Sequence, residues 1–139
     1  MSLTEALGDA SKRDQVIDDC VELVDTEVKR KSGLGGMVIK TGYKAVKGIR
    51  PGFIRGVVNS LFDQWAAQLD PIWAEGNRSA FESQRSRVAD ALLKVTDDKS
   101  ESAKSALVKS TYKKLRPTAK KHVEEAVPGL AGLLAKHAG

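Results

Sequence analysis

Residues 11–18 read SKRDQVID and residues 83–90 read SQRSRVAD, so one pattern occurs twice in the chain. The match continues to Asp25 in the first copy and to Asp97 in the second. After three-residue gaps, VIKTGYK at 38–44 aligns with LVKSTYK at 107–113, and Arg50-Pro51 aligns with Arg116-Pro117. Apolar residues recur at helical spacing, and no long alternating strand pattern is present. We therefore predict an all-α helical bundle built from two pseudo-symmetric helical repeats.

A chain of 139 residues fits a single domain, 1–139, with repeat units at about 11–70 and 79–137. The pair Gly76-Asn77 marks the boundary between them. No apolar run approaches the ~20 residues that span a bilayer. The first residues lack the pattern of a secretory signal. Cys20, the single cysteine, is expected to be a buried, reduced thiol, which favours the cytoplasm.

Caps and prolines predict where the helices begin and end. Ser11 is the expected N-cap of the first helix, and Gly33 its end. A second helix over 34–49 would turn Val38 and Tyr43 inward. A third helix is expected over 52–69. A new helix is then expected to begin at Asp70-Pro71, with Asp70 as its N-cap and Pro71 in its first position. The second unit would hold helices over 79–96 and 102–115, a loop at 97–100, and a last helix after Pro117, kinked at Pro128.

Charge alternates in phase with the repeat. Residues 1–27 hold two basic and eight acidic side chains (net −6), and residues 28–62 hold eight basic and no acidic ones (net +8). Residues 63–98 hold four basic and seven acidic side chains (net −3), and residues 99–139 hold nine basic and three acidic ones (net +6). Two explanations are open. The segments neutralise one another in pairs worth ~0–1 kcal/mol each, or the basic segments form a shared positive surface.

The second explanation gives the leading functional hypothesis, a non-enzymatic interaction protein. Its basic surface would engage an acidic macromolecular partner or support self-association. The candidate binding residues are the lysines and arginines of two basic segments: Lys40, Lys44, Lys47, Arg50, Arg55, Lys109, Lys113, Lys114, Arg116, Lys120 and Lys121.

Four other partners or functions stay open. Non-specific nucleic-acid binding would use the same lysines on phosphates, although no helix-turn-helix, zinc-finger or aromatic stacking pattern is visible. An anionic membrane surface is less favoured, because the basic helix lacks an exposed Trp or Phe. Exchange of the terminal helix between two copies would give a homodimer. A small-ligand-binding protein or an enzyme would need a pocket between the two repeats.

The sequence predicts no catalytic residues, no metal site and no cofactor. His122 and His137 are too far apart on one helix to share a metal. His122 and Glu125 are expected to form a surface pair. The glycine-rich stretch 32–36 lacks the spacing of a phosphate-binding loop and fits a helix–helix turn.

Several stretches carry a resemblance that covers nearly the whole chain: KSGL at 31–34, YKAVKGIRPG at 43–52, LDP at 69–71, VADALLKVTD at 88–97, LRP at 115–117 and HVEEAVP at 122–128. The chain resembles an uncharacterised family of small bacterial proteins, classed as a domain of unknown function. The resemblance implies a soluble, single-domain bacterial protein. It carries over no activity and no site residues.

Overall fold

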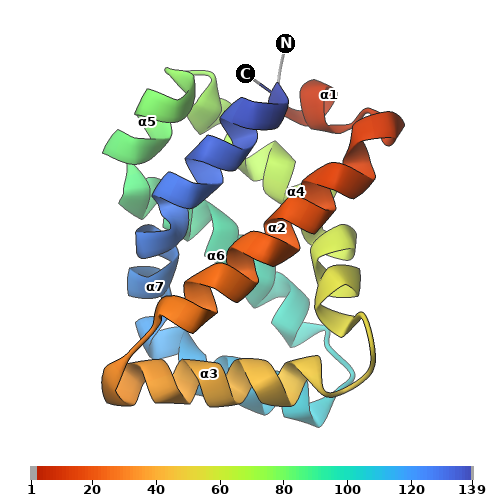
Figure 1. The fold of residues 1–139 in the computed structure, drawn as a ribbon, viewed down its shortest axis with the longest axis vertical. Helices are drawn as coiled ribbons and strands as arrows, with labels where there is room; N and C mark the ends of the chain where they lie inside the picture. Colours follow the sequence, from red (N-terminus) through yellow and green to blue (C-terminus); the bar gives the residue numbers. More distant parts are fainter. Residues whose placement is uncertain (1–2, 139) are drawn as a thin grey trace.

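The computed structural model describes residues 3–138, except the side chains of Ala10 and Leu34, and the described part contains helices and no strand. Figure 1 labels the helices: α1 (Leu3–Leu7), α2 (Ala10–Arg30), α3 (Gly33–Lys47), α4 (Phe53–Trp73), α5 (Asn77–Ser83), α6 (Arg85–Glu101) and α7 (Ala106–Ala138). The predicted all-α helical bundle is confirmed.

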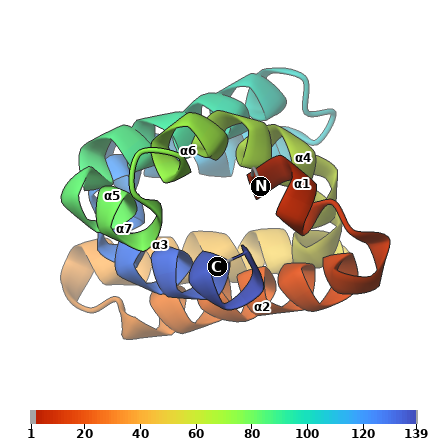
Figure 2. The same ribbon diagram turned by 90° about the horizontal axis from the view of Figure 1, so that it is seen from above.

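The helices form two layers. Figure 2 shows α2 and the C-terminal part of α7 on one side of the molecule, and α4 and α6 on the other. In Figure 1, α1, α5 and both termini lie at one end, whereas α3 runs across the opposite end. The first turns of α7 contact α3 there, so two basic segments distant in sequence meet at one end of the bundle.

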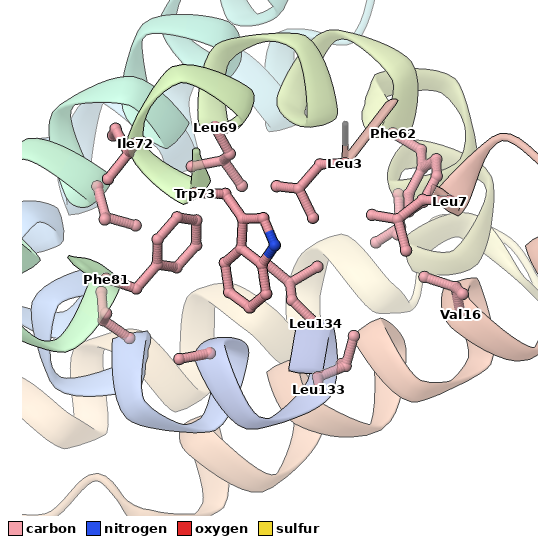
Figure 3. Close-up of a cluster of buried hydrophobic side chains, with 14 of the residues drawn as sticks. Leu3, Leu7, Val16, Phe62, Leu69, Ile72, Trp73, Phe81, Leu133 and Leu134 are labelled. Atoms are coloured by element: carbon pink, nitrogen blue, oxygen red, sulfur yellow. The ribbon is translucent and has the colours of Figure 1, made fainter. Parts of the chain in front are cut away.

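The best-packed part of the core lies at the end that holds α1 and α5. Figure 3 shows Trp73 of α4 near Phe81 of α5, and their rings meet edge to face with centroids 5.1 Å apart. Leu3 and Leu7 of α1 enter the same cluster with exposures of 0% and 2%, so the short α1 is a structural part of the bundle.

Two N-caps differ from their predicted positions. Asp9, and not Ser11, caps α2, because its carboxylate accepts a hydrogen bond from the Ser11 amide. Asp70 does not restart a helix, since α4 continues through Pro71 to Trp73. Its carboxylate instead accepts a hydrogen bond from the Leu3 amide at 2.7 Å, so Asp70 caps α1 across the fold.

The helix boundaries of the second half are also corrected. The stretch predicted as one helix over 79–96 is divided at Gln84 into α5 and α6. The expected loop at 97–100 belongs to α6, because Asp97 is held by bonds to α7. Pro117 does not separate two helices. α7 runs through both Pro117 and Pro128, supported by its packing against α6, α5 and α2.

Equivalent positions of the sequence repeat form the same contacts in both halves. The Tyr43 hydroxyl donates to Asp25, and the Tyr112 hydroxyl donates to Asp97. A cation four residues after each tyrosine pairs with the same carboxylate: Lys47 with Asp25 at 3.6 Å, and Arg116 with Asp97 at 2.8 Å. Arg116 therefore corresponds to Lys47 in its contacts, rather than to Arg50. The symmetry of the complete units stays a prediction.

Candidate functional site

An apolar cavity of about 300 Å³ lies between the helices of the two predicted units. Its wall consists almost entirely of apolar atoms. Five helices and the α2–α3 turn contribute the lining residues: Cys20, Leu23, Val24, Glu27 and Val28 of α2, Lys31 of the turn, Ile39 of α3, Val58 and Trp65 of α4, Leu92, Leu93 and Thr96 of α6, and His122, Val123, Ala126, Val127 and Leu130 of α7.

Close helix contacts hold the walls of this cavity in place. The Trp65 indole donates a hydrogen bond of 3.2 Å to the Leu92 carbonyl, which joins α4 to α6. On the other side, α2 approaches α7 at Gly129, where a Cβ atom would lie 2.7 Å from Leu23 Cδ1. A side chain at this position would require the Leu23 side chain to shift. The cavity therefore lies between helices fixed to one another at its borders.

A small polar cluster lies at one edge of the cavity. Lys31 is 8% exposed, and its Nζ is 3.3 Å from Glu125 Oε2. His122 Nδ1 is 3.8 Å from Glu125 Oε1, which is too long for a hydrogen bond, and this nitrogen is buried without a partner. His122 and Glu125 thus lie side by side, as the sequence predicted, but the imidazole is largely buried and does not form a hydrogen bond with Glu125. The buried Nδ1 is an unused hydrogen-bonding group at the cavity.

His122 and Cys20 on the wall favour their neutral forms. Burial, with help from the nearby Lys31 and Lys121 charges, lowers the pKa of His122 below its ordinary value of 6.5, so the imidazole is neutral at pH 7. Burial raises the pKa of the Cys20 thiol to about 11. A protonated thiol is a poor nucleophile.

Comparison with known proteins supports the resemblance seen in the sequence. The family of unknown function DUF6918 matches residues 3–138. The chain belongs to this family. No curated protein and no solved structure matches it.

Among residues 3–138 of this DUF6918 protein, no group of three or more metal-binding side chains comes together. No helix in the same range has the length and apolar character needed to cross a bilayer.

The eleven predicted binding residues separate into two groups. Four of them form ion pairs with acidic helices: Lys47 with Asp25, Arg55 with Asp14 and Asp18, Arg116 with Asp97, and Lys120 with Asp90. The Arg116 guanidinium holds the pKa of Asp97 below its usual range. These four charges therefore take part in holding the fold of the DUF6918 protein.

The other seven form no ion pair with the described part of the chain. Arg50 lies over the Phe53 ring, with its guanidinium carbon 5.3 Å from the ring centroid. The remaining six are lysines of α3 and α7: Lys40, Lys44, Lys109, Lys113, Lys114 and Lys121. All six are exposed, and α3 contacts α7, so these charges gather around one end of the molecule.

Sequence reasoning missed the cavity residues Lys31 and His122. Lys31 follows two other basic residues at the end of α2 and is nevertheless buried. His122 precedes Val123 and lies one turn before Ala126 and two turns before Leu130, so helical spacing places it on the cavity side of α7. That spacing was the available signal. The cavity itself depends on tertiary packing and has no sequence signature.

Proposed function

We propose that this protein binds a small apolar molecule in the cavity between its two halves. The observation that carries the proposal is the cavity itself, whose wall is built by residues of α2, α4, α6 and α7, with Ile39 of α3. Ligand sites in proteins are concave, mostly apolar and often located between helices of bundles.

The cavity has the size and the chemistry of a ligand site. A volume of about 300 Å³ reaches the lower range of small-molecule pockets. A cavity with an apolar wall gives water few hydrogen-bond partners, which favours apolar ligands. Filling it would replace the missing contacts of the wall atoms with dispersion contacts to the ligand.

The polar cluster adds one feature to the expected ligand. The Thr96 hydroxyl is already bonded to Tyr112, and Lys31 is paired with Glu125, whereas His122 Nδ1 has no partner. A buried polar atom without a hydrogen bond costs about 1–3 kcal/mol. A ligand with an aliphatic body and one hydroxyl group would satisfy it once the imidazole turns this atom toward the cavity, because Nδ1 is buried in the structure. An aliphatic alcohol such as decanol is therefore a suitable probe.

Trp65 provides the readout, because its indole lines the cavity. In a Trp73→Phe background, titration with decanol is expected to change Trp65 emission with saturation. Absence of a saturable change, together with an unchanged melting temperature at high decanol, would contradict the proposal, since a ligand that binds the native state raises its stability.

A cavity-filling variant tests the location. Ala126 lines the cavity, and Ala126→Phe is expected to weaken decanol binding at least about tenfold by occupying its volume. Ala67→Phe is the matched control, because Ala67 is exposed on α4 and is not part of the wall. Equal binding by both variants would place the ligand elsewhere. Circular dichroism checks that each variant keeps its helices.

The basic-surface hypothesis stays a second proposal for an acidic macromolecular partner or for self-association. It is supported by the six lysines without ion pairs on α3 and α7. Binding of an acidic protein or a nucleic acid through them would weaken steeply with salt, and a gel shift at rising salt concentration measures this for DNA. Replacing Lys40 and Lys44 with Glu is expected to abolish it, and unchanged binding would remove the hypothesis.

A further inference from the structure

Large apolar side chains are exposed at one end of the molecule. Among the described residues, three large apolar side chains are exposed: Met37 with 64% of its surface, Val38 with 41% and Leu107 with 44%. Met37 and Val38 belong to α3, and Leu107 belongs to the first turn of α7. The sequence predicted an inward position for Val38, and the structure corrects this.

These side chains lie close together because α3 packs on α7. A Cβ atom on Gly42 would lie 3.1 Å from Thr111 Cγ2, so the two backbones approach closely. Met37, Val38 and Thr111 line one shallow groove between the helices. Leu107 lies one turn before Thr111, on the same side of α7. The apolar residues of both helices therefore share one surface.

Lysines without ion pairs lie beside these apolar residues. Lys114 lines the same groove. Lys40 and Lys44 follow Met37 on its side of α3, at spacings of one and two helical turns. We name the surface formed by Met37, Val38, Leu107, Lys40, Lys44 and Lys114 the α3 face. Its two chain segments, 28–62 and 102–121, contain no acidic residue.

We propose that the α3 face docks on the surface of an anionic lipid bilayer. Figure 1 shows α3 running across the end of the bundle, so its exposed side can lie along a flat surface. Membrane-surface helices combine apolar side chains, which enter the acyl boundary, with lysines that attract anionic headgroups. The lysine stems add apolar length beside Met37 and Leu107.

Charge and apolar exposure together favour a bilayer over other partners. On a nucleic acid, the exposed methionine and leucine would lie against phosphates and gain nothing. In a dimer through the α3 face, lysines of both copies would face one another without an acid between them. A bilayer uses both features. The inner side of α3 contributes Ile39 to the cavity, so docking would bring the cavity near the lipid, although the docking does not depend on the cavity proposal.

Co-sedimentation of the full chain with vesicles tests the inference. We expect binding to vesicles made of equal parts phosphatidylglycerol and phosphatidylcholine, and much weaker binding to phosphatidylcholine alone. The double variant Lys40→Gln, Lys44→Gln is expected to weaken partition roughly 25-fold, at ~5-fold for each lysine near an anionic surface. The double variant Met37→Ser, Leu107→Ser is expected to weaken it roughly tenfold by removing apolar insertion.

The matched control is Lys12→Gln, Arg85→Gln. Both residues are exposed and without ion pairs in the described structure, and they lie at the starts of α2 and α6, away from the α3 face. Their removal changes net charge by the same amount, yet its effect is screened beyond a Debye length of ~10 Å. Partition is expected to change less than about twofold.

Three results would overturn the inference. The first is failure of the wild-type chain to bind the phosphatidylglycerol vesicles. The second is an equal loss of binding in the control, which would reveal attraction by net charge alone. The third is an unchanged partition of the serine variant, which would exclude insertion of the apolar residues. Tight binding of a short DNA duplex through Lys40 and Lys44, with no vesicle binding, would assign the face to nucleic acid instead.

Discussion

At the scale of residues, His122 connects burial, charge and pH. Its folded pKa lies below the ordinary 6.5, because burial and the Lys31 charge disfavour the imidazolium. The unfolded chain therefore takes up a proton more readily than the native protein. It follows that His122 lowers the free energy of unfolding as the pH falls below 6.5 and has no such effect well above it.

A thermal-melting series checks this sign. From pH ~7.5 to ~5.5, a window that spans the ordinary histidine pKa, the wild type is expected to lose stability relative to His122→Asn, which cannot titrate. Above that window the difference between the two proteins should be constant. A difference that stays constant throughout, or that favours the wild type in acid, would contradict the burial of this imidazole.

Gly42 lies inside α3 at its close contact with α7. A Cβ atom there would lie 3.1 Å from Thr111 Cγ2 and 3.2 Å from Leu115 Cδ1. Gly42→Val is expected to destabilise the protein by about 1–3 kcal/mol, because it overpacks the α3–α7 contact. Urea denaturation measures the change.

Gly56 on α4 is the matched control for this prediction. Nothing lies within 4 Å of its Cβ position, so Gly56→Ala is expected to stabilise the protein by roughly 0.5–1 kcal/mol through helix propensity alone. An unchanged stability of Gly42→Val would mean that α3 does not pack on α7 as described.

At the scale of elements, α1 depends on a residue 67 positions away in sequence. Asp70 Oδ1 accepts from the Leu3 amide, and its other oxygen accepts from the Thr4 hydroxyl at 3.3 Å. Asp70→Ala is expected to cost about 1 kcal/mol, the usual value of an N-cap. Increased proteolysis near the N-terminus would accompany the loss, because the cap anchors α1.

Asp98 provides the comparison for Asp70. It is exposed on α6 and forms no ion pair with described residues, so Asp98→Ala is expected to change the free energy of unfolding by no more than about 0.5 kcal/mol. Chemical denaturation measures both changes. If the two substitutions lower the free energy of unfolding equally, the Asp70 hydrogen bonds to α1 contribute nothing to stability.

The existence and type of the long helices were predictable, and several of their ends were not. Periodic apolar residues such as Val16 and Ile17 mark a buried face, and both are fully buried. The pair Asp70-Pro71 carries a local signal for a new helix, yet α4 continues because its last turn buries Ile72 and Trp73. Tertiary packing decided such boundaries, and local signals do not contain it.

At the scale of the whole molecule, the repeat predicted contacts better than it predicted a site. Aligned Asp25 and Asp97 both accept from the aligned tyrosines, so the pattern carried real three-dimensional information. The sequence predicted a pocket between the two units only under the alternative hypothesis of a ligand-binding protein or an enzyme. Its residues come from five helices and the α2–α3 turn, and most of them are apolar residues that do not differ in sequence from ordinary core residues.

The measurement that tests the cavity most directly is methyl NMR of the protein titrated with decanol. The account predicts saturable shifts of cavity methyl groups such as those of Val24, Val28, Leu92 and Leu130, and small changes for Leu3 and Leu7 in the packed core. Shifts restricted to Met37, Val38 and Leu107 at the exposed end, or no saturable shift at all, would contradict it.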